Sequence, residues 1–245
     1  METTDDQTKW REYIKDKNQF SQDIPFNFKN IYSKLKIASE NPDKLNPFYT
    51  LSSIYDFTKF FYNISTALSM GFSDITTKAE QMRQKFQEYP DSTDIQDLLY
   101  KEIQLGIYKL NGENNKSLGH GSDQYSGYVS ACRTFLRLLW FLEYLIDVFE
   151  NLLKDSGKTP IKKILGNSYN KILAPRHPFI VRKAVGIALM FSSAGSVADS
   201  VKIIFDYDQY TDEARKTIQN TIDLMKTVWK GGNDFYIKYK LLDLK

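Results

Sequence analysis

The sequence predicts an all-α protein, and three observations lead to this prediction. Glycine and proline are scarce, with 12 and 7 in 245 residues, so few tight turns are available for a fold of many short strands. Apolar residues recur at intervals of three and four over long stretches, which is the period of an α-helix. No stretch keeps the two-residue alternation of a half-buried strand. Because hydrophobic residues make up 42% of the chain, it can bury a sizeable core.

The helices are expected to follow one another along one main domain. In chain order they are predicted to span residues 48–86, 94–110, 129–154, 161–172, 179–191 and 211–230. The main domain is predicted to comprise residues 46–245, and the polar, mixed residues 1–45 to form a helical extension that packs on it or flanks it. Residues 111–127 are rich in glycine, asparagine and serine, so we expect an exposed loop there.

Proline and asparagine mark the limits of the first long helix. Asn46-Pro47 precedes it, and its apolar residues form one stripe from Ile64 to Phe86. A break in this helix is expected near residues 69–73, and Tyr89-Pro90-Asp91 ends it.

The stretch 129–154 has the strongest helical pattern of the chain, and Gly157 and Pro160 end it. Proline disfavours the helical conformation in the residue before it. Pro175 and Pro178 are therefore expected to separate the helices on either side of them.

The last helix is predicted to begin at Thr211-Asp212, which can cap its first turn. Gly231-Gly232 is expected to stop it, and Phe235 to Leu244 then form an apolar tail.

Composition argues against several classes of protein. The formal net charge of +3 is too small for a nucleic-acid-binding surface, although it is compatible with weak attraction to an anionic membrane. The longest uncharged apolar stretch, Ala184 to Ala198, is shorter than the ~20 residues that cross a bilayer. The single cysteine, Cys132, fits a reducing compartment. We therefore expect a cytoplasmic monomer that binds membranes transiently and does not bind nucleic acid.

The motifs of common enzymes are missing from the sequence. Two histidines, His120 and His177, and one cysteine cannot make a common zinc site. The segment Gly119–Asp123 contains a serine beside a histidine, but no strand precedes it as a nucleophile elbow requires. The sequence has no P-loop and no dinucleotide fingerprint. We expect no catalysis, no metal and no cofactor.

Two arginines in the strongest helix point to anion binding. At about 100° per residue, Arg133, Arg137, Trp140 and Tyr144 fall within one narrow arc of the helix. Two guanidinium groups one turn apart, beside aromatic residues, form a fork suited to a phosphate. An exposed basic edge would have the same spacing, so both interpretations stay open on this pattern alone.

Asp74, Lys78 and His177 are further candidates, and each has an ordinary explanation. Asp74 and Lys78 are four residues apart and share a helix face, as a common surface ion pair does. A lone histidine beside a proline, such as His177, is more often structural than ligand-binding.

Together with their neighbours, these residues resemble the glycolipid transfer protein superfamily and, within it, the ceramide-1-phosphate transfer proteins. The resemblance runs from about Asn46 to the C-terminus. It is carried, in order, by Phe72-Ser73-Asp74-Ile75-Thr76-Thr77-Lys78, Cys132-Arg133-Thr134-Phe135-Leu136-Arg137, Ser168-Tyr169-Asn170, Pro175-Arg176-His177-Pro178-Phe179-Ile180-Val181-Arg182-Lys183-Ala184-Val185 and Leu241-Leu242-Asp243-Leu244. Each piece is short, but their order and spacing are specific.

The resemblance implies a two-layer helical sandwich that encloses a pocket for lipid chains and binds the headgroup on one layer. It implies that Asp74 accepts hydrogen bonds from the ceramide amide and hydroxyl groups, and that His177 donates to the ceramide carbonyl. Lys78, Arg133 and Arg137 would hold the phosphate. The implied function is transfer of a phosphosphingolipid, in the first place ceramide-1-phosphate, between membranes without catalysis.

The sequence departs from the family pattern at two aromatic positions. Sugar-carrying members have a tryptophan at the position of Arg137, whereas here Trp140 lies one turn further on. Aligning Trp140 instead would indicate a glycosylceramide carrier but would lose the match of both arginines. The family often has a tryptophan near its membrane-docking surface, where this sequence has Phe179. Phe179 and Trp140 are thus expected to dock on the membrane or lie beside the headgroup.

Three other functions remain open at the level of sequence. The protein could be a sphingolipid sensor or adaptor, in which lipid binding changes a contact with a partner protein. It could be an unrelated helical interaction module. A sphingolipid-modifying enzyme is the least favoured, since no nucleophile–base pair or metal cluster is found.

Overall fold

The computed structural model of the chain describes residues 9–23, 25–64, 66–112, 125–190, 195–205 and 211–244, and it confirms the prediction of an all-α fold. Among these residues the strand-like pairings are two isolated β-bridges, Asn111 with Val129 and Pro160 with Ser196. Most of the loop expected at 111–127, including His120, lies outside the described residues.

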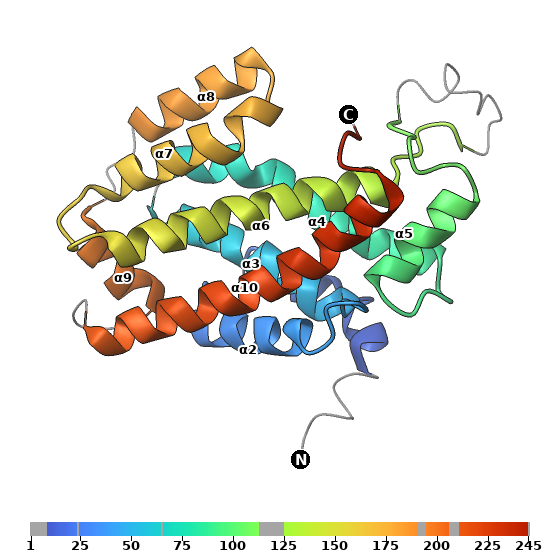
Figure 1. Cartoon of the computed structure of the whole chain (residues 1–245), viewed down its shortest axis with the longest axis horizontal. Coiled ribbons are helices and arrows are strands. Elements are labelled where there is room, and N and C mark those ends of the chain that lie inside the picture. The colour runs from blue at the N-terminus through green and yellow to red at the C-terminus, as the bar shows by residue number, and fades with distance from the viewer. Residues whose placement is uncertain are drawn as a thin grey trace.

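The described elements agree with most of the predicted helices. In chain order they are η1 (Lys17–Phe20), α2 (Phe28–Ser39), α3 (Pro47–Ile64), α4 (Thr66–Glu88), α5 (Ile95–Gln104), α6 (Ala131–Lys154), α7 (Ile161–Ile172), η4 (Ala174–Arg176), α8 (Phe179–Met190), α9 (Val197–Phe205) and α10 (Asp212–Tyr239) (Figure 1).

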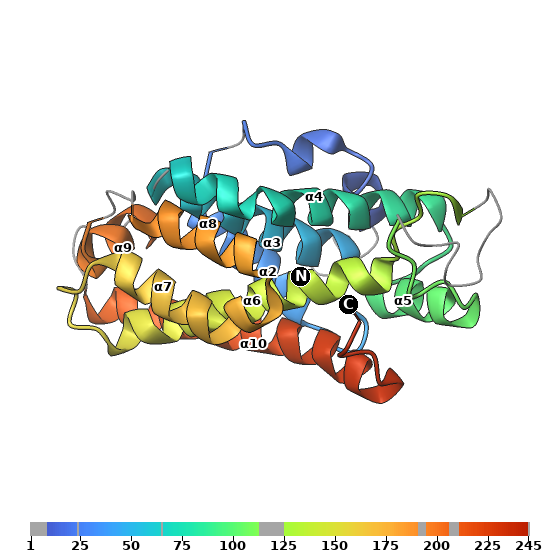
Figure 2. The same ribbon diagram turned by 90° about the horizontal axis from the view of Figure 1, so that it is seen from above.

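The helices form two layers, which are seen from the side in Figure 2. One layer contains α3 and α4, and the other contains α6, α7 and α10. Between the layers α6 packs against α4. At one edge α2 packs on both α3 and α10, and at the other edge α8 packs on both α4 and α7. The predicted two-layer helical sandwich is thereby confirmed.

Aromatic side chains fill the interface between the two layers. Phe61 of α3 and Phe72 of α4 stack with their ring centroids 3.9 Å apart. Phe141 and Tyr144 of α6 lie 5.5 and 5.8 Å from Phe72, and all four rings are buried. These rings therefore occupy the space between α4 and α6 where a pocket for lipid chains is expected.

Residues 9–20, from the N-terminal extension, cover the outer side of α4 (Figure 2). Trp10 packs edge-on against Phe86 of α4, with ring centroids 5.7 Å apart. The fully buried guanidinium of Arg83 donates to the carbonyl of Ile14 at 3.0 Å and pairs with Glu80 on its own helix. The extension is thus held to the main domain by both packing and hydrogen bonds.

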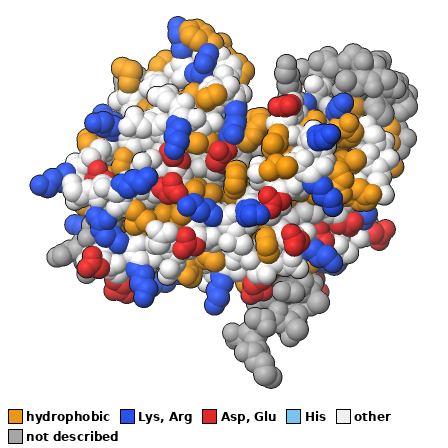
Figure 3. Space-filling view, viewed as in Figure 1, with side chains coloured by type: hydrophobic (Ala, Val, Ile, Leu, Met, Phe, Trp, Pro, Cys, Tyr) orange, Lys and Arg blue, Asp and Glu red, His pale blue; other side chains and the backbone are white. Residues whose placement is uncertain are grey.

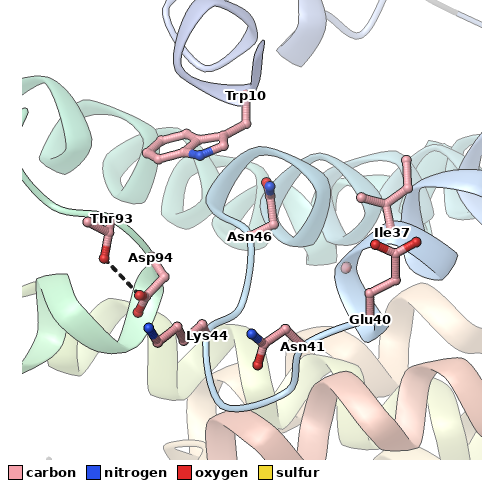
Figure 4. Close-up of a pocket in the computed structure, with 9 residues that line it drawn as sticks. Trp10, Ile37, Glu40, Asn41, Lys44, Asn46, Thr93 and Asp94 are labelled. Atoms are coloured by element: carbon pink, nitrogen blue, oxygen red, sulfur yellow. Dashed lines mark hydrogen bonds between the residues drawn. The ribbon is translucent and has the colours of Figure 1, made fainter. Parts of the chain in front are cut away.

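A polar hollow of about 270 Å³ lies where Trp10, the α2–α3 connection and the start of α5 meet (Figure 4). Asp94 lies in its wall and has a structural partner on each oxygen. One oxygen accepts the N–H of Asp97 at 2.8 Å, which caps α5, and the other accepts the hydroxyl of Thr93 at 2.9 Å. None of the predicted site residues lines this hollow.

Two helix boundaries differ from the prediction. Residues 69–73 are helical, since α3 ends at Ile64 and α4 begins at Thr66. The packing of Phe72 against the layer interface outweighs the low helix propensity of its glycine and serine neighbours. The helix predicted to reach residue 110 ends at Gln104. Gly106 there has a φ of 72°, and the next N–H closes the helix end onto the carbonyl of residue 102.

The helix α9 was not predicted, although its sequence contains a start signal. The hydroxyl of Ser196 accepts the N–H of Asp199 at 3.2 Å, and the Asp199 carboxylate accepts the N–H of Ser196 at 3.0 Å. This reciprocal pair is a capping box. Val197 and Val201 then bury one side of the short helix.

The prediction that Gly231-Gly232 stops the last helix was wrong, because α10 continues to Tyr239. Both glycines serve close packing instead. A Cβ atom at Gly231 would lie 2.1 Å from the carbonyl oxygen of Pro42, and one at Gly232 would lie 2.7 Å from Leu139. The glycines let α10 approach its neighbours closely.

None of the helices in the described part of the chain is long and apolar enough to cross a membrane. The described residues also contain no group of three or more histidine, cysteine, aspartate or glutamate side chains that could hold a metal.

Candidate functional site

Four of the predicted site residues, Asp74, Arg137, Trp140 and His177, meet at a small recess between the two layers. Its walls come from α4, α6, α7, the segment after η4, and α8. The lining residues are Phe72, Asp74, Ile75, Arg137, Trp140, Tyr169, Leu173, His177 and Val185. The recess has a volume of about 50 Å³, which is room for a few water molecules and far less than a lipid chain requires.

Helix α4 contributes a carboxylate and an ammonium group from neighbouring turns. Asp74 and Lys78 form an ion pair, as their spacing of four residues predicts. The Asp74 side chain is 68% exposed and that of Lys78 is 18% exposed. Because the carboxylate is accessible to solvent, the pair contributes little to stability, and both groups are available to a ligand.

Helix α6 contributes the two arginines, and its first turn is firmly held. Ser130 caps the helix by accepting the N–H of Arg133 at 3.1 Å. The buried carboxylate of Glu102 accepts the N–H groups of Ala131 and Cys132 at 2.6 and 2.9 Å. The Ser130 hydroxyl and the Glu102 carboxylate therefore fix the backbone of the helix turn that carries Arg133.

Arg137 lies over the turn that begins at Arg133. Its Nη1 donates to the carbonyl of Arg133 at 2.8 Å, which fixes the direction of the guanidinium. Burial, together with the positive charge of Arg133, lowers the pKa of Arg137 to about 10. Burial also lowers the pKa of Arg133. Both shifts mean that the recess holds its positive charges at an electrostatic cost, which an anion would relieve.

The recess carries an excess of positive charge. Among the described residues no carboxylate lies within ion-pair distance of Arg133 or Arg137, and Asp74 is already paired with Lys78. Three cations and one carboxylate leave two positive charges. A phosphate monoester carries −1.5 to −2 charges at neutral pH, so the charges are matched.

Trp140 lies beside two guanidinium groups. The centres of the Arg137 and Arg176 guanidinium groups are each 5.1 Å from the centroid of its ring. Arg176 is held in place by Glu143, one turn of α6 beyond the tryptophan, at 2.8 Å. The indole of Trp140 therefore has two cation–π partners.

His177 faces the recess from the segment that follows η4. Its Nδ1 lies 3.0 Å from the hydroxyl oxygen of Tyr169 on α7. Burial lowers the pKa of His177, and Lys78 and Arg176 lower it too, whereas Asp74 raises it. The imidazole is therefore neutral at physiological pH.

Sequence reasoning missed two residues of this region, Tyr169 and Arg176. Both stand in pieces that carry the family resemblance, but neither was assigned a role. Tyr169 is eight residues before His177, and the turn at Pro175 that brings them together is not visible from spacing. Arg176 was noted only as a neighbour of His177. All five predicted headgroup residues, by contrast, lie at the recess or contact a residue that lines it.

Phe179 lies outside the recess, at the start of α8. None of the residues of α8 is fully buried, and Phe179 and Ile180 are 62% and 77% exposed. Arg182 and Lys183 lie over the Phe179 ring at 5.9 and 4.7 Å from its centroid. Apolar and basic side chains are thus mixed over α8, as the upper left of Figure 3 shows.

The comparisons with known proteins identify the family. The family model "Glycolipid transfer protein (GLTP)" matches residues 44–196, so the chain belongs to this family of lipid transfer proteins, as the sequence predicted. The chain is 25% identical over 207 residues to the ceramide-1-phosphate transfer protein of Danio rerio, which covers 84% of this chain and 91% of that protein.

Two solved structures have the same fold. The mouse ceramide-1-phosphate transfer protein in its apo form superposes with a TM-score of 0.74 at 19% identity, over 90% of this chain and 100% of that one. The human ceramide-1-phosphate transfer protein in complex with 2:0 ceramide-1-phosphate gives a TM-score of 0.73 at 19% identity, over 91% and 100% of the two chains.

Proposed function

We propose that this protein carries ceramide-1-phosphate, or a closely related phosphosphingolipid, between membranes without catalysis. The observation that carries the proposal is the pair of half-buried arginines, which have no carboxylate partner among the described residues and leave two positive charges at the recess. The similarity to proteins named for ceramide-1-phosphate transfer supports the same headgroup.

In this proposal each polar residue has one role. Lys78, Arg133 and Arg137 bind the phosphate, and the planar guanidinium groups suit paired hydrogen bonds to its oxygens. Asp74 accepts hydrogen bonds from the ceramide amide N–H and hydroxyl groups. His177 donates to the ceramide carbonyl. A carboxylate with a neutral imidazole suits an amide, whereas the three cations suit a dianion.

The lipid chains would enter below the headgroup, between α4 and α6. The aromatic rings of Phe61, Phe72, Phe141 and Tyr144 fill this space, and the recess above them holds about 50 Å³. Chain uptake therefore requires these rings or their helices to move apart. The gain is large, because each methylene removed from water contributes roughly 0.8 kcal/mol.

Membrane docking is proposed at the start of α8, next to the recess. Phe179 and Ile180 are exposed and would insert into the lipid surface, while Arg182 and Lys183 would contact anionic headgroups. Trp140 is proposed to support the headgroup cations and not to insert. We infer a cytoplasmic monomer that meets membranes transiently.

Native mass spectrometry of the purified protein tests the proposed ligand directly. The expected spectrum shows one bound lipid per chain with the mass of a phosphate-bearing ceramide. A hexosylceramide in its place would favour a glycolipid carrier. The same mass in Arg137→Leu, at a similar fraction bound, would remove the phosphate role of the arginines.

A further inference from the structure

The side chains of Tyr169 and His177 connect α7 to the segment that follows η4. The two rings meet at the recess, with the tyrosine oxygen 3.0 Å from Nδ1 and the ring centroids 5.7 Å apart. Tyr169 is 4% exposed, so its side chain is held by packing beside the imidazole. Among the described residues this is the hydrogen bond found for the imidazole, which leaves Nε2 for another partner.

A neutral imidazole has one N–H donor and one bare nitrogen that accepts. If the Tyr169 hydroxyl donates, Nδ1 is bare and Nε2 carries the proton. If the hydroxyl accepts, Nδ1 carries the proton and Nε2 is bare. The direction of this one hydrogen bond therefore decides whether His177 presents a donor or an acceptor to a ligand.

With Lys78 and Arg137 assigned to the phosphate, Asp74 is the polar group that shares the amide with His177. The carboxylate of Asp74, which pairs with Lys78, offers acceptors and no donor. An amide needs one acceptor for its N–H and one donor for its C=O. Asp74 with a bare Nε2 would offer two acceptors and leave the amide carbonyl unpaired, which is costly in a half-buried site.

We propose that Tyr169 is a positioning residue: its hydroxyl donates to Nδ1 of His177, holds the ring in the form protonated at Nε2, and thereby makes His177 a donor that completes recognition of the lipid amide. The role rests on the proposed function, because it assumes that a ceramide amide meets His177. It makes Tyr169 a determinant of amide recognition that acts through His177.

The tautomer can be measured without a lipid. The chain has two histidines, so in a His120→Gln background the ¹⁵N-histidine spectrum reports His177 alone. We expect a bare Nδ1 and a protonated Nε2 in this background, and a mixture of both forms after Tyr169→Phe. Tyr89→Phe is the matched control, because Tyr89 also makes one hydroxyl hydrogen bond, with the hydroxyl of Tyr128 at 3.2 Å, and does not line the recess.

Vesicle transfer of ceramide-1-phosphate supplies the functional measurement on the same variants. We expect Tyr169→Phe to lower transfer about two- to tenfold, the range of one neutral hydrogen bond, and Tyr89→Phe to leave it unchanged. The circular dichroism of both variants should match the parent.

Three results would overturn the proposal: a proton on Nδ1 in the parent, an unchanged tautomer in Tyr169→Phe, or equal losses of transfer in the two variants. A parent protein that moves no ceramide-1-phosphate would instead refute the proposed function. The tautomer measurement would still stand, so the two failures are distinguishable.

Discussion

Arg137 offers the sharpest test of the phosphate site. We predict that Arg137→Leu cuts ceramide-1-phosphate transfer strongly and that Arg137→Lys restores it only in part. A guanidinium has five N–H donors, and Arg137 spends one of its N–H groups on the carbonyl of Arg133. The remaining donors can make parallel bonds to phosphate oxygens, whereas a lysine presents a point charge without this geometry.

The size of the effect follows from the type of bond that is lost. A hydrogen bond to a charged group contributes about 1.5–3 kcal/mol, so the loss of even one bond lowers affinity by more than tenfold. Relief of repulsion between Arg137 and Arg133 partly offsets this loss, because the two charges destabilise each other. We therefore expect a fall of ten- to a hundredfold for leucine and a smaller fall for lysine.

The assay measures transfer rate and vesicle co-sedimentation on the same set of proteins. Binding to bare anionic vesicles depends on diffuse surface charge, so Arg137→Leu should change it little. Lys183→Gln serves as the contrasting variant, since Lys183 lies on the exposed start of α8 and should lower co-sedimentation. If transfer and co-sedimentation fall in parallel for Arg137→Leu, then Arg137 docks on membranes and the reasoning about the phosphate is refuted.

Three further predictions follow from single contacts. Asp74→Val should abolish transfer but leave the helical circular dichroism signal and the thermal midpoint nearly unchanged, because its exposed ion pair contributes at most about 1 kcal/mol to stability. Retained transfer would mean that Asp74 is only a surface ion-pair partner of Lys78. Gly231→Ala should lower the free energy of unfolding by about 2 kcal/mol or more in urea titration, whereas Gly186→Ala, which meets nothing within 4 Å, should not. Burial keeps the pKa of His177 below its unfolded value near 6.5, so the unfolded chain binds the proton first. Stability should therefore fall as the pH drops below about 6.5, and His177→Gln should remove that part of the decline in urea titrations.

Much of the fold could be predicted because its helices are long and strongly periodic. The limits of α6 and α7 agree with prediction to within two residues, since Ser130, Gly157 and Pro160 are local signals. The continuation of α10 could not be predicted in this way. Two consecutive glycines usually indicate the end of a helix. Here they are needed because the α2–α3 connection and α6 approach α10 too closely for a side chain, and this approach is visible only in the folded structure.

The site was predictable where its residues share a helix and not where they meet through the fold. The spacing of four residues placed Asp74 with Lys78 and Arg133 with Arg137. The contact between α7 and the segment after η4, which brings a tyrosine hydroxyl onto Nδ1 of His177, depends on tertiary structure and leaves no periodic signal. The clamping of α6 by a buried glutamate from α5 is hidden for the same reason.

The extension and α9 show two further limits of sequence reasoning. The mixed, polar composition of residues 1–45 gave little sign that they would cover Arg83. The partner of its guanidinium there is the backbone carbonyl of Ile14, and a backbone group leaves no signal in the sequence. For α9 the Ser196–Asp199 capping box was present in the sequence but was hidden at the end of a long apolar stretch. Local signals therefore need to be sought inside apolar runs as well as between them.

The most direct test of the account is a comparison of two lipids in one transfer assay. Vesicles containing ceramide-1-phosphate or glucosylceramide share the ceramide and differ in the headgroup, so the ratio of their transfer rates isolates headgroup recognition. The two excess positive charges at the recess, with Trp140 in contact with Arg137 and Arg176, predict that ceramide-1-phosphate moves at least tenfold faster. Equal or faster transfer of glucosylceramide would contradict the account and would assign Trp140 to a sugar.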